Sequence, residues 1–348
     1  MDQPMTRLQQ WPRIAVVGAG AVGGYFGGLF ARSGAPVVLI GRSHFVDAVN
    51  ASGLVLDKSE GQERIRAKAT TEISAVRDCS LILFCVKAND TSETAKQMAP
   101  FLPPDATVDC LQNGVDNADR IRAAANVVVL PAAVYVAVSM PEAGRVKHLA
   151  RGDLIIGPPS ARTTKVADAF IRAGISCRIS DNIEGELWLK LLRNCALNAI
   201  SALGHARYGQ IARSDDAKKL MEQIVDEVLA VARAAGVVLP GVDDRESGMA
   251  AAMELATQMA DAFSSTAQDL NRGQPTEIDA LNGYISRRGE ELSEKGSSRR
   301  NRGHSQSRRS NFSEGPKSPY RQQPAGPGGG QGESRGVGIS YPSSFELH

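Results

Sequence analysis

The sequence has few of the residues that build disulfide frameworks and metal sites. Its five cysteines are odd in number and show no C-x-x-C spacing: Cys79, Cys85, Cys110, Cys177 and Cys195. Its five histidines are equally dispersed, so we expect reduced thiols and no metal site. The longest apolar run, residues 127–140, contains Pro131 and is too short to cross a bilayer. These absences predict a cytoplasmic protein without a membrane segment.

Most of the chain also lacks a large excess of charge of one sign. The net charge of the whole chain is +2. Residues 297–348 hold eight Lys or Arg and three Asp or Glu, a net charge of +5, which leaves −3 for residues 1–296. This end is rich in Ser, Gly, Arg, Pro and Gln and has no apolar periodicity, so we expect a disordered basic tail. Because no nucleic-acid-binding module accompanies its arginines, we expect no nucleic-acid partner.

What the sequence does contain is a glycine run near its start. The run G-A-G-A-V-G, residues 18–23, follows the apolar stretch 13–17 and leads into a helix-like segment at 22–32. In a dinucleotide site the first glycine makes a tight turn, the second lets the backbone approach the pyrophosphate, and the third lets helix and strand pack closely. The anion then lies on the helix N-terminus. The cofactor-binding residues predicted here are Gly18, Gly20, Ala21, Val22 and Gly23. A signal peptide is disfavoured by the six glycines within residues 14–31.

The second apolar run, residues 36–40, lacks the carboxylate that an NAD site usually places at its end. It is followed instead by Gly41, Arg42 and Ser43. A guanidinium can bind a ribose 2′-phosphate bidentately, so Arg42 predicts NADP(H) rather than NAD. The alternative is an arginine in a solvated loop.

Short apolar runs and helical patterns alternate over the first half of the chain. This alternation predicts a Rossmann-type α/β domain at residues 1–180, with a parallel sheet covered on both faces. Lys87 and Asn113 each follow a predicted strand, at the sheet edge where ligands bind. The expected strands are 13–17, 36–40, 81–86, 107–111, 127–130, 134–138, 146–149 and 154–157, and the expected helices include 22–32 and 91–98.

Beyond residue 180 the strand signals stop, which predicts a helical domain at residues 181–296 and a substrate cleft between the two domains. Its expected helices are 183–203, 215–235, 244–262 and 276–292. Lys190, Asn194 and Asn198 are spaced four apart and make one polar ridge on the first of these helices. Asparagine is a poor helix former, which favours a functional ridge over a solvated stripe.

A second polar set lies in residues 264–279. Thr276 and Asp279 resemble a capping box that would hold Glu277 in the first turn of the last helix. A carboxylate near Lys190 would keep its amine protonated.

Taken together, these motifs resemble the ketopantoate reductase (2-dehydropantoate 2-reductase) family over roughly the first 290 residues. They are the glycine run, Lys87, L-Q-N-G at 111–114, W-x-K-L-x-x-N-x-x-x-N at 188–198, and S-S-x-x-Q-D-L-x-R-G-x-P-T-E-I-D-x-L-N-G at 264–283. The resemblance implies an N-terminal Rossmann-type NADP-binding domain and an all-helical C-terminal domain like that of 6-phosphogluconate dehydrogenase. It also implies NADPH-dependent reduction of 2-dehydropantoate to (R)-pantoate, a step of pantothenate and coenzyme A biosynthesis.

The resemblance further implies residue roles. Lys190 would donate a proton to the keto oxygen, and Glu277 would orient Lys190 and bind a substrate hydroxyl. Lys87 would join Arg42 near the 2′-phosphate. The residues that would hold the substrate are Asn113, which also faces the cofactor, Asn194, Asn198 and Ser265. The expected partner is a small 2-oxo acid, and whether the chain forms a homodimer is left open.

The family pattern breaks off near the end of the helical domain. Instead of a Gly-x-x-x-Pro-x-Asn stretch and one more apolar helix, the chain reads E-E-L-S-E-K-G at 290–296 and then the basic tail. A reading-frame change near residue 295 would produce this. Two alternatives remain: a paralogue that reduces another small 2-oxo acid, and a non-catalytic NADPH-binding protein with an altered C-terminus. Intact Lys190 and Glu277 favour an enzyme.

Overall fold

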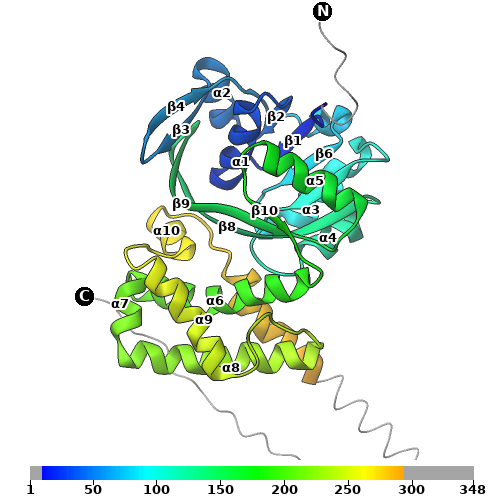
Figure 1. Ribbon diagram of the computed structural model, residues 1–348. Coiled ribbons are helices and arrows are strands. Elements are labelled where there is room, and N and C mark those ends of the chain that lie inside the picture. The colour runs from blue at the N-terminus through cyan, green and yellow to red at the C-terminus, as the bar shows by residue number, and fades with distance from the viewer. Residues whose placement is uncertain (1–9, 294–348) are drawn as a thin grey trace, which may run out of the picture. The chain divides into compact units, whose positions relative to one another are not determined.

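The computed structural model describes residues 10–293, so the predicted tail at 297–348 lies outside the described residues. The first half of the chain forms a ten-stranded sheet in the order β4-β3-β9-β8-β7-β6-β1-β2-β5, with β10 paired to β9 (Figure 1). One side of the sheet is wholly parallel and comprises β1 (Ile14–Val17), β2 (Val37–Ile40), β5 (Lys68–Thr70), β6 (Leu81–Phe84) and β7 (Thr107–Cys110), and β7 also pairs in parallel with β8. The remaining strands are β3 (Leu54–Lys58), β4 (Gly61–Ile65), β8 (Val128–Glu142), β9 (Arg145–Ile156) and β10 (Cys177–Ile179).

The central strands are buried on both faces, which explains the unbroken apolar sequences of β1 and β6. Every residue of β1, β6 and β7 is buried. Alternate residues of β1 enter different clusters: Val16 packs with Phe26 and Phe170, whereas Val17 packs with Met98 and Ile121. Helices α1 (Ala21–Arg32) and α5 (Ala161–Arg172) therefore cover one face, and α3 (Thr91–Met98) and α4 (Asn117–Ala124) cover the other. Helix α2 (Ser43–Ser52) follows β2.

Two long strands replace four of the short strands that the sequence predicts. The predicted strands 127–130 and 134–138 are both parts of β8, and 146–149 and 154–157 are parts of β9. The apolar pattern is interrupted because the β8–β9 hairpin is irregular, with register shifts at three places. Strands β4, β5 and β10 were not predicted, since they are short or carry mostly polar residues. Strand β3 was not predicted either, although it begins with three apolar residues.

The second half of the described chain is helical. Helices α6 (Ile183–Leu203) and α8 (Asp215–Ala235) have the predicted bounds, and α7 (Tyr208–Arg213), α9 (Arg245–Gln258) and α10 (Ser265–Asn271) complete the group. Figure 1 shows α6, α7, α8 and α9 gathered together, and their apolar residues form one core around Leu192, Met221 and Val225. The fold is thus a Rossmann-like sheet and helix domain followed by a helical domain.

The last predicted helix, 276–292, is wrong at its start. The chain forms a short 3₁₀ turn, η4 (Ile278–Ala280), and then a helix over residues 282–293. Leu281 separates them with φ −110° and ψ −104°. The predicted capping box is absent, because Glu277 rather than Thr276 precedes η4 and no side chain caps it. Glu277 is instead engaged with the sheet domain, as described below.

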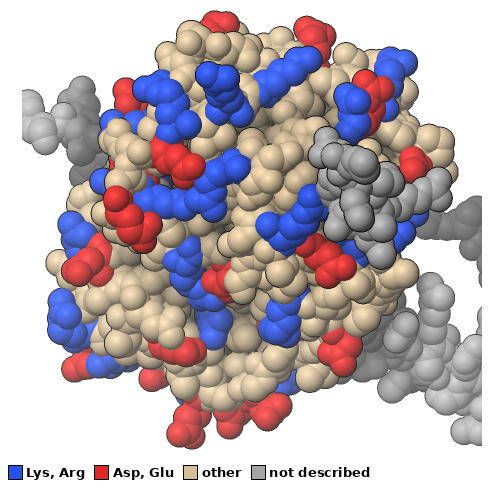
Figure 2. All heavy atoms as spheres, turned by 45° about the horizontal axis from the view of Figure 1, so that its top comes forward, with Lys and Arg blue, Asp and Glu red and all other residues tan. Residues whose placement is uncertain are grey.

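The surface carries charges of both signs. Basic and acidic side chains are interspersed on the face shown in Figure 2, and neither sign dominates it. Within residues 10–293, the helices are all too short or too polar to cross a lipid bilayer.

Candidate functional site

The three glycines of the turn between β1 and α1 have different surroundings, which indicate a different role for each. Gly18 has φ +91°, and a Cβ there would lie 2.6 Å from the backbone nitrogen of Val86. A Cβ on Gly23 would lie 2.5 Å from the carbonyl oxygen of Gly18, so helix and strand pack closely only without it. At Gly20, by contrast, a Cβ would meet no atom of the described part of the chain within 4 Å. Gly20 therefore leaves open space at the N-terminus of α1, which fits the approach of a pyrophosphate.

Arg42 lies at the end of β2, where it precedes the first residue of α2. Its side chain is exposed and makes no hydrogen bond or ion pair within residues 10–293. The arrangement of an open helix N-terminus and an uncommitted guanidinium fits a nicotinamide dinucleotide that carries a 2′-phosphate.

A chain of hydrogen bonds joins the helical domain to the edge of the sheet. The Lys190 ammonium on α6 donates to Oδ1 of Asn113 at 2.9 Å. The amide nitrogen of Asn113 donates to Oε2 of Glu277 at 3.2 Å, and Oε1 of Glu277 accepts from the backbone N–H of Ala88 at 2.8 Å. Glu277 thus reaches Lys190 through Asn113 and not directly.

Electrostatics make the Lys190 ammonium more acidic than an exposed lysine. The pKa of Lys190 is lowered to about 8: burial is the largest cause, Glu277 opposes it, and the nearby charge of Arg151 adds to the lowering. A protonated amine at this pKa releases its proton readily near neutral pH, which suits a general acid.

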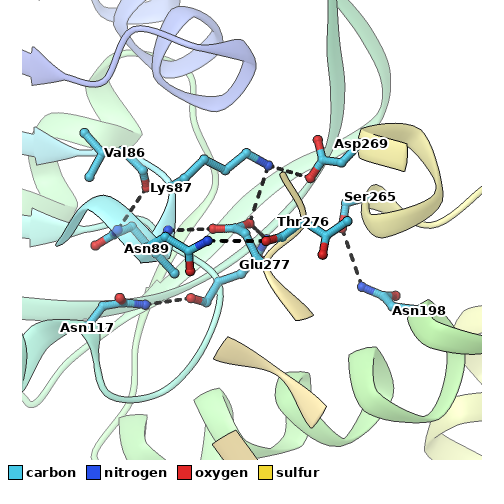
Figure 3. Close-up of polar contacts among 12 residues, drawn as sticks. Val86, Lys87, Asn89, Asn117, Asn198, Ser265, Asp269, Thr276 and Glu277 are labelled. Atoms are coloured by element: carbon cyan, nitrogen blue, oxygen red, sulfur yellow. Dashed lines mark hydrogen bonds and ion pairs between the residues drawn. The ribbon is translucent and has the colours of Figure 1, made fainter. Parts of the chain in front are cut away.

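Lys87 also lies at this site, where it makes contacts that the sequence analysis did not predict. Its ammonium lies 2.7 Å from Oδ2 of Asp269 and 3.7 Å from Oε2 of Glu277, as Figure 3 shows. Asn89, on the same segment, donates to the carbonyl oxygen of Thr276 at 3.5 Å. Lys87 thus contacts two carboxylates of the helical domain, and its place near Arg42 and the 2′-phosphate stays a prediction.

The two asparagines of the polar ridge on α6, Asn194 and Asn198, have different surroundings. Asn198 is buried, its amide nitrogen lies 3.5 Å from Oγ of Ser265 (Figure 3), and its Oδ1 accepts from the hydroxyl of Tyr208 at 3.0 Å. Ser264 caps α10 by accepting from the N–H of Ala267. Asn194 is half-buried and its side chain makes no hydrogen bond among the described residues. The structure thus brings Lys190, Asn113 and Glu277 together, and separately Asn198 and Ser265.

Sequence reasoning missed two residues of this region. Asp269 was noted in its motif but given no role, because nothing in the sequence shows that it meets Lys87. Tyr135 on β8 is the second: its ring centroid lies 5.9 Å from the Lys190 ammonium. A tyrosine inside an apolar run is typical of a core strand, so no signal distinguished it.

Comparisons with known proteins agree with this architecture. The family model described as ketopantoate reductase PanE/ApbA matches residues 14–161, and the model of its C-terminal part matches residues 182–295. The chain is 30% identical over 298 residues to the 2-dehydropantoate 2-reductase of Mesorhizobium japonicum, which covers 77% of this chain and 89% of that protein.

Solved structures are similar over most of the chain as well. A PanE/ApbA family ketopantoate reductase from Ralstonia eutropha is 44% identical, with a TM-score of 0.75 and coverage of 80% of this chain and 92% of that one. A D-mandelate dehydrogenase solved with NADH and anilino(oxo)acetate is 25% identical, with the same TM-score and the same coverage. Since two family models cover most of the described residues and the named relatives are oxidoreductases, the chain belongs to the ketopantoate reductase family.

Proposed function

We propose that this protein reduces 2-dehydropantoate to (R)-pantoate with NADPH, within pantothenate and coenzyme A biosynthesis. The observation that carries the proposal is the series of hydrogen bonds from Lys190 through Asn113 to Glu277. It places an ammonium of lowered pKa and a carboxylate at the edge of the sheet where a dinucleotide would bind. The family membership and the relatives named 2-dehydropantoate 2-reductase support it.

The cofactor would bind along the carboxyl edge of the sheet, in a domain that we place at residues 1–180. The residues Gly18, Gly20, Ala21, Val22 and Gly23 would hold its pyrophosphate, Arg42 its 2′-phosphate, and Asn113 would lie near its reactive end. When bound, NADPH supplies the hydride for the keto carbon.

The helical domain, which we place at residues 181–296, would supply the acid chemistry. Lys190 would donate its proton to the keto oxygen, since its pKa of about 8 leaves it mostly protonated at neutral pH. General acid catalysis contributes about 10²–10⁴ in rate, and a preorganised donor at a developing oxyanion about 10²–10³. Asn113 would fix the direction of the Lys190 ammonium, because its amide is itself oriented by Glu277.

Substrate recognition would use the other polar residues of the cleft. Asn194, Asn198 and Ser265 would bind the carboxylate and hydroxyl groups, and Glu277 a hydroxyl. Lys87 remains a proposed residue of the cofactor side, although its contacts with Asp269 and Glu277 favour a role in holding that carboxylate.

The test is NADPH oxidation by the purified chain with 2-dehydropantoate, beside pyruvate and an aromatic 2-oxo acid of the benzoylformate type. The aromatic acid is included because a D-mandelate dehydrogenase is among the similar structures. We expect the highest kcat/KM with 2-dehydropantoate. A higher kcat/KM with another acid would favour the paralogue, and NADPH binding without turnover would favour the non-catalytic protein.

A further inference from the structure

The β8–β9 hairpin carries a strained residue beside the proposed site. Tyr135 pairs with Asp153 and Val136 with Arg151, so Gly152 between them has no partner on β8. Arg151 has φ +60°, a left-handed conformation that residues other than glycine rarely adopt, and Gly152 has φ +144°. Bulges of this kind redirect side chains near active sites, and strain persists where the surroundings enforce it.

The bulge delivers the Arg151 guanidinium to the ring of Tyr135. Its Cζ lies 4.4 Å from the ring centroid, within the range of a cation–π contact. Asp153 holds it there with two hydrogen bonds, from Nε at 3.0 Å and from Nη2 at 2.8 Å. The Lys190 ammonium lies 5.9 Å from the same centroid. The two cations are therefore no more than about 10.3 Å apart, the sum of the two centroid distances.

We propose that Arg151 is a positioning residue whose fixed positive charge, placed on Tyr135 by the bulge, repels the Lys190 ammonium and prepares it to release its proton. The inference rests on the proposed function, in which Lys190 is the proton donor. Arginine suits this role because its guanidinium stays charged at every working pH. A partly buried setting strengthens such a repulsion relative to water.

The other groups that act on Lys190 come from several elements. Glu277, before η4, and Cys110 on β7 raise the pKa of Lys190, whereas burial and Arg151 lower it. Lys87 and Asp269 are linked to it only through Glu277. Arg193 on α6 lies beside Tyr135 and is itself paired with Glu254 at 3.3 Å. Arg151 is thus the positive charge that the hairpin contributes, and Asp153, which pairs with it at 2.8 Å, is a negative charge that stays when Arg151 is replaced.

The experiment measures kcat/KM for 2-oxo acid reduction against pH. The rate falls above the pKa of Lys190, because the free enzyme must hold the proton that it donates. Arg151→Gln should move this alkaline limb upward by about 0.5–1 pH unit. Arg151→Lys, which keeps the charge, should move it by less than half as much. Arg145→Gln removes a charge from the same strand, where it pairs with Asp57 and Glu142, and should not move it.

A second variant without the charge allows for misfolding of the first. A second measurement, which needs no turnover, keeps the test valid if the proposed function is wrong. Arg151→Asn removes the charge with a side chain that tolerates positive φ, so it preserves the bulge. Acetic anhydride labelling of Lys190 in the ligand-free chain, followed by mass spectrometry across pH, reports its pKa without turnover and should show the same shift.

Each outcome then decides one of the two ideas. An unmoved limb and an unmoved labelling profile in folded Arg151→Gln or Arg151→Asn would overturn the role of Arg151, as would an equal shift in Arg151→Lys. If Lys190→Ala keeps the parent activity, Lys190 is not the proton donor of the proposed function, while the labelling profile still tests the effect of Arg151 on its pKa.

Discussion

At the scale of single residues, Lys190 is the group on which the proposed chemistry depends. We expect Lys190→Ala to lower kcat at least about a hundredfold, because it removes both a proton donor and an oxyanion contact. NADPH binding, followed by its fluorescence, should stay near normal. Lys219→Ala on α8, whose side chain is 72% exposed, is the matched control and should leave both unchanged. Turnover by Lys190→Ala above about a third of the parent rate would mean that another group donates the proton.

Arg42 tests the choice of cofactor. A charge-assisted contact is worth about 1.5–3 kcal/mol, so Arg42→Ala should weaken NADPH binding by about ten- to a hundredfold and leave NADH nearly untouched. Titration of the two cofactors by fluorescence measures this. Arg66→Ala, also an exposed arginine, serves as the control. Equal losses for NADPH and NADH would show that Arg42 does not read the 2′-phosphate.

Asp109 on β7 is a buried acid that the proposed mechanism does not use. Within residues 10–293, neither of its carboxylate oxygens has a hydrogen-bond partner, and burial raises its pKa from 3.8 to about 8. Between these values the folded chain binds one proton more than the unfolded chain, so the free energy of unfolding falls as pH rises, by at most about 1.4 kcal/mol per unit.

Asp109→Asn removes this proton linkage. The melting temperature of the variant, minus that of the parent, should therefore increase from pH 5 to pH 8.5 by several degrees, as followed by circular dichroism. Asp105→Asn, at an exposed position just before β7, should show a constant difference. A constant difference for Asp109→Asn too would mean that its carboxyl is not protonated in the folded chain.

At the scale of elements, two glycines of the β1–α1 turn should affect different properties, one the stability of the fold and the other the binding of the cofactor. Gly23→Ala places a Cβ 2.5 Å from the Gly18 carbonyl oxygen, so it should lower the melting temperature strongly. Gly20→Ala meets nothing within 4 Å, so it should fold with only a small loss but bind NADPH at least about tenfold more weakly, since its methyl occupies the approach of the pyrophosphate. Melting curves and fluorescence titration of both variants check this. Similar melting losses with unchanged NADPH affinity for Gly20→Ala would contradict it.

Elements with one dominant signal were predictable from the sequence, and elements shaped by distant contacts were not. Helices α6 and α8 follow from apolar periodicity between clear end signals, and their bounds were predicted correctly. The β8–β9 hairpin was divided because its bulges interrupt the period of two. The helix predicted from residue 276 starts later because Glu277 binds the N–H of Ala88, 189 residues away.

At the scale of the whole molecule, the candidate site is assembled from both domains. The sequence identified Lys190, Asn113 and Glu277 through their motifs, but the order in which they connect depends on side chains more than 70 residues apart. The same reason hid the contact between Lys87 and Asp269, which local patterns cannot encode. Motifs therefore selected side chains that lie together in the structure, but they did not predict how these side chains pair.

The contact between Lys87 and Asp269 links the sheet edge to α10, whose first residue is Ser265. The Lys87 side chain is 46% exposed, so the pair should stabilise the fold by only about 1 kcal/mol or less. Its larger effect should be on substrate binding, because α10 carries a proposed substrate ligand. We expect Asp269→Asn to raise KM for the 2-oxo acid about three- to tenfold and to change kcat less than about threefold.

Asp226→Asn is the matched control for this change. Asp226 pairs with Arg245 between α8 and α9, so the variant loses an ion pair within the helical domain and none to the sheet. Steady-state kinetics of the two variants then distinguish an effect on the placement of α10, seen in KM, from an effect on the chemical step, seen in kcat. If Asp269→Asn behaves like Asp226→Asn, the contact does not place α10. If it lowers kcat about a hundredfold at unchanged KM, Asp269 acts on the chemical step, because loss of an interaction made only in the transition state lowers kcat and leaves ground-state binding intact.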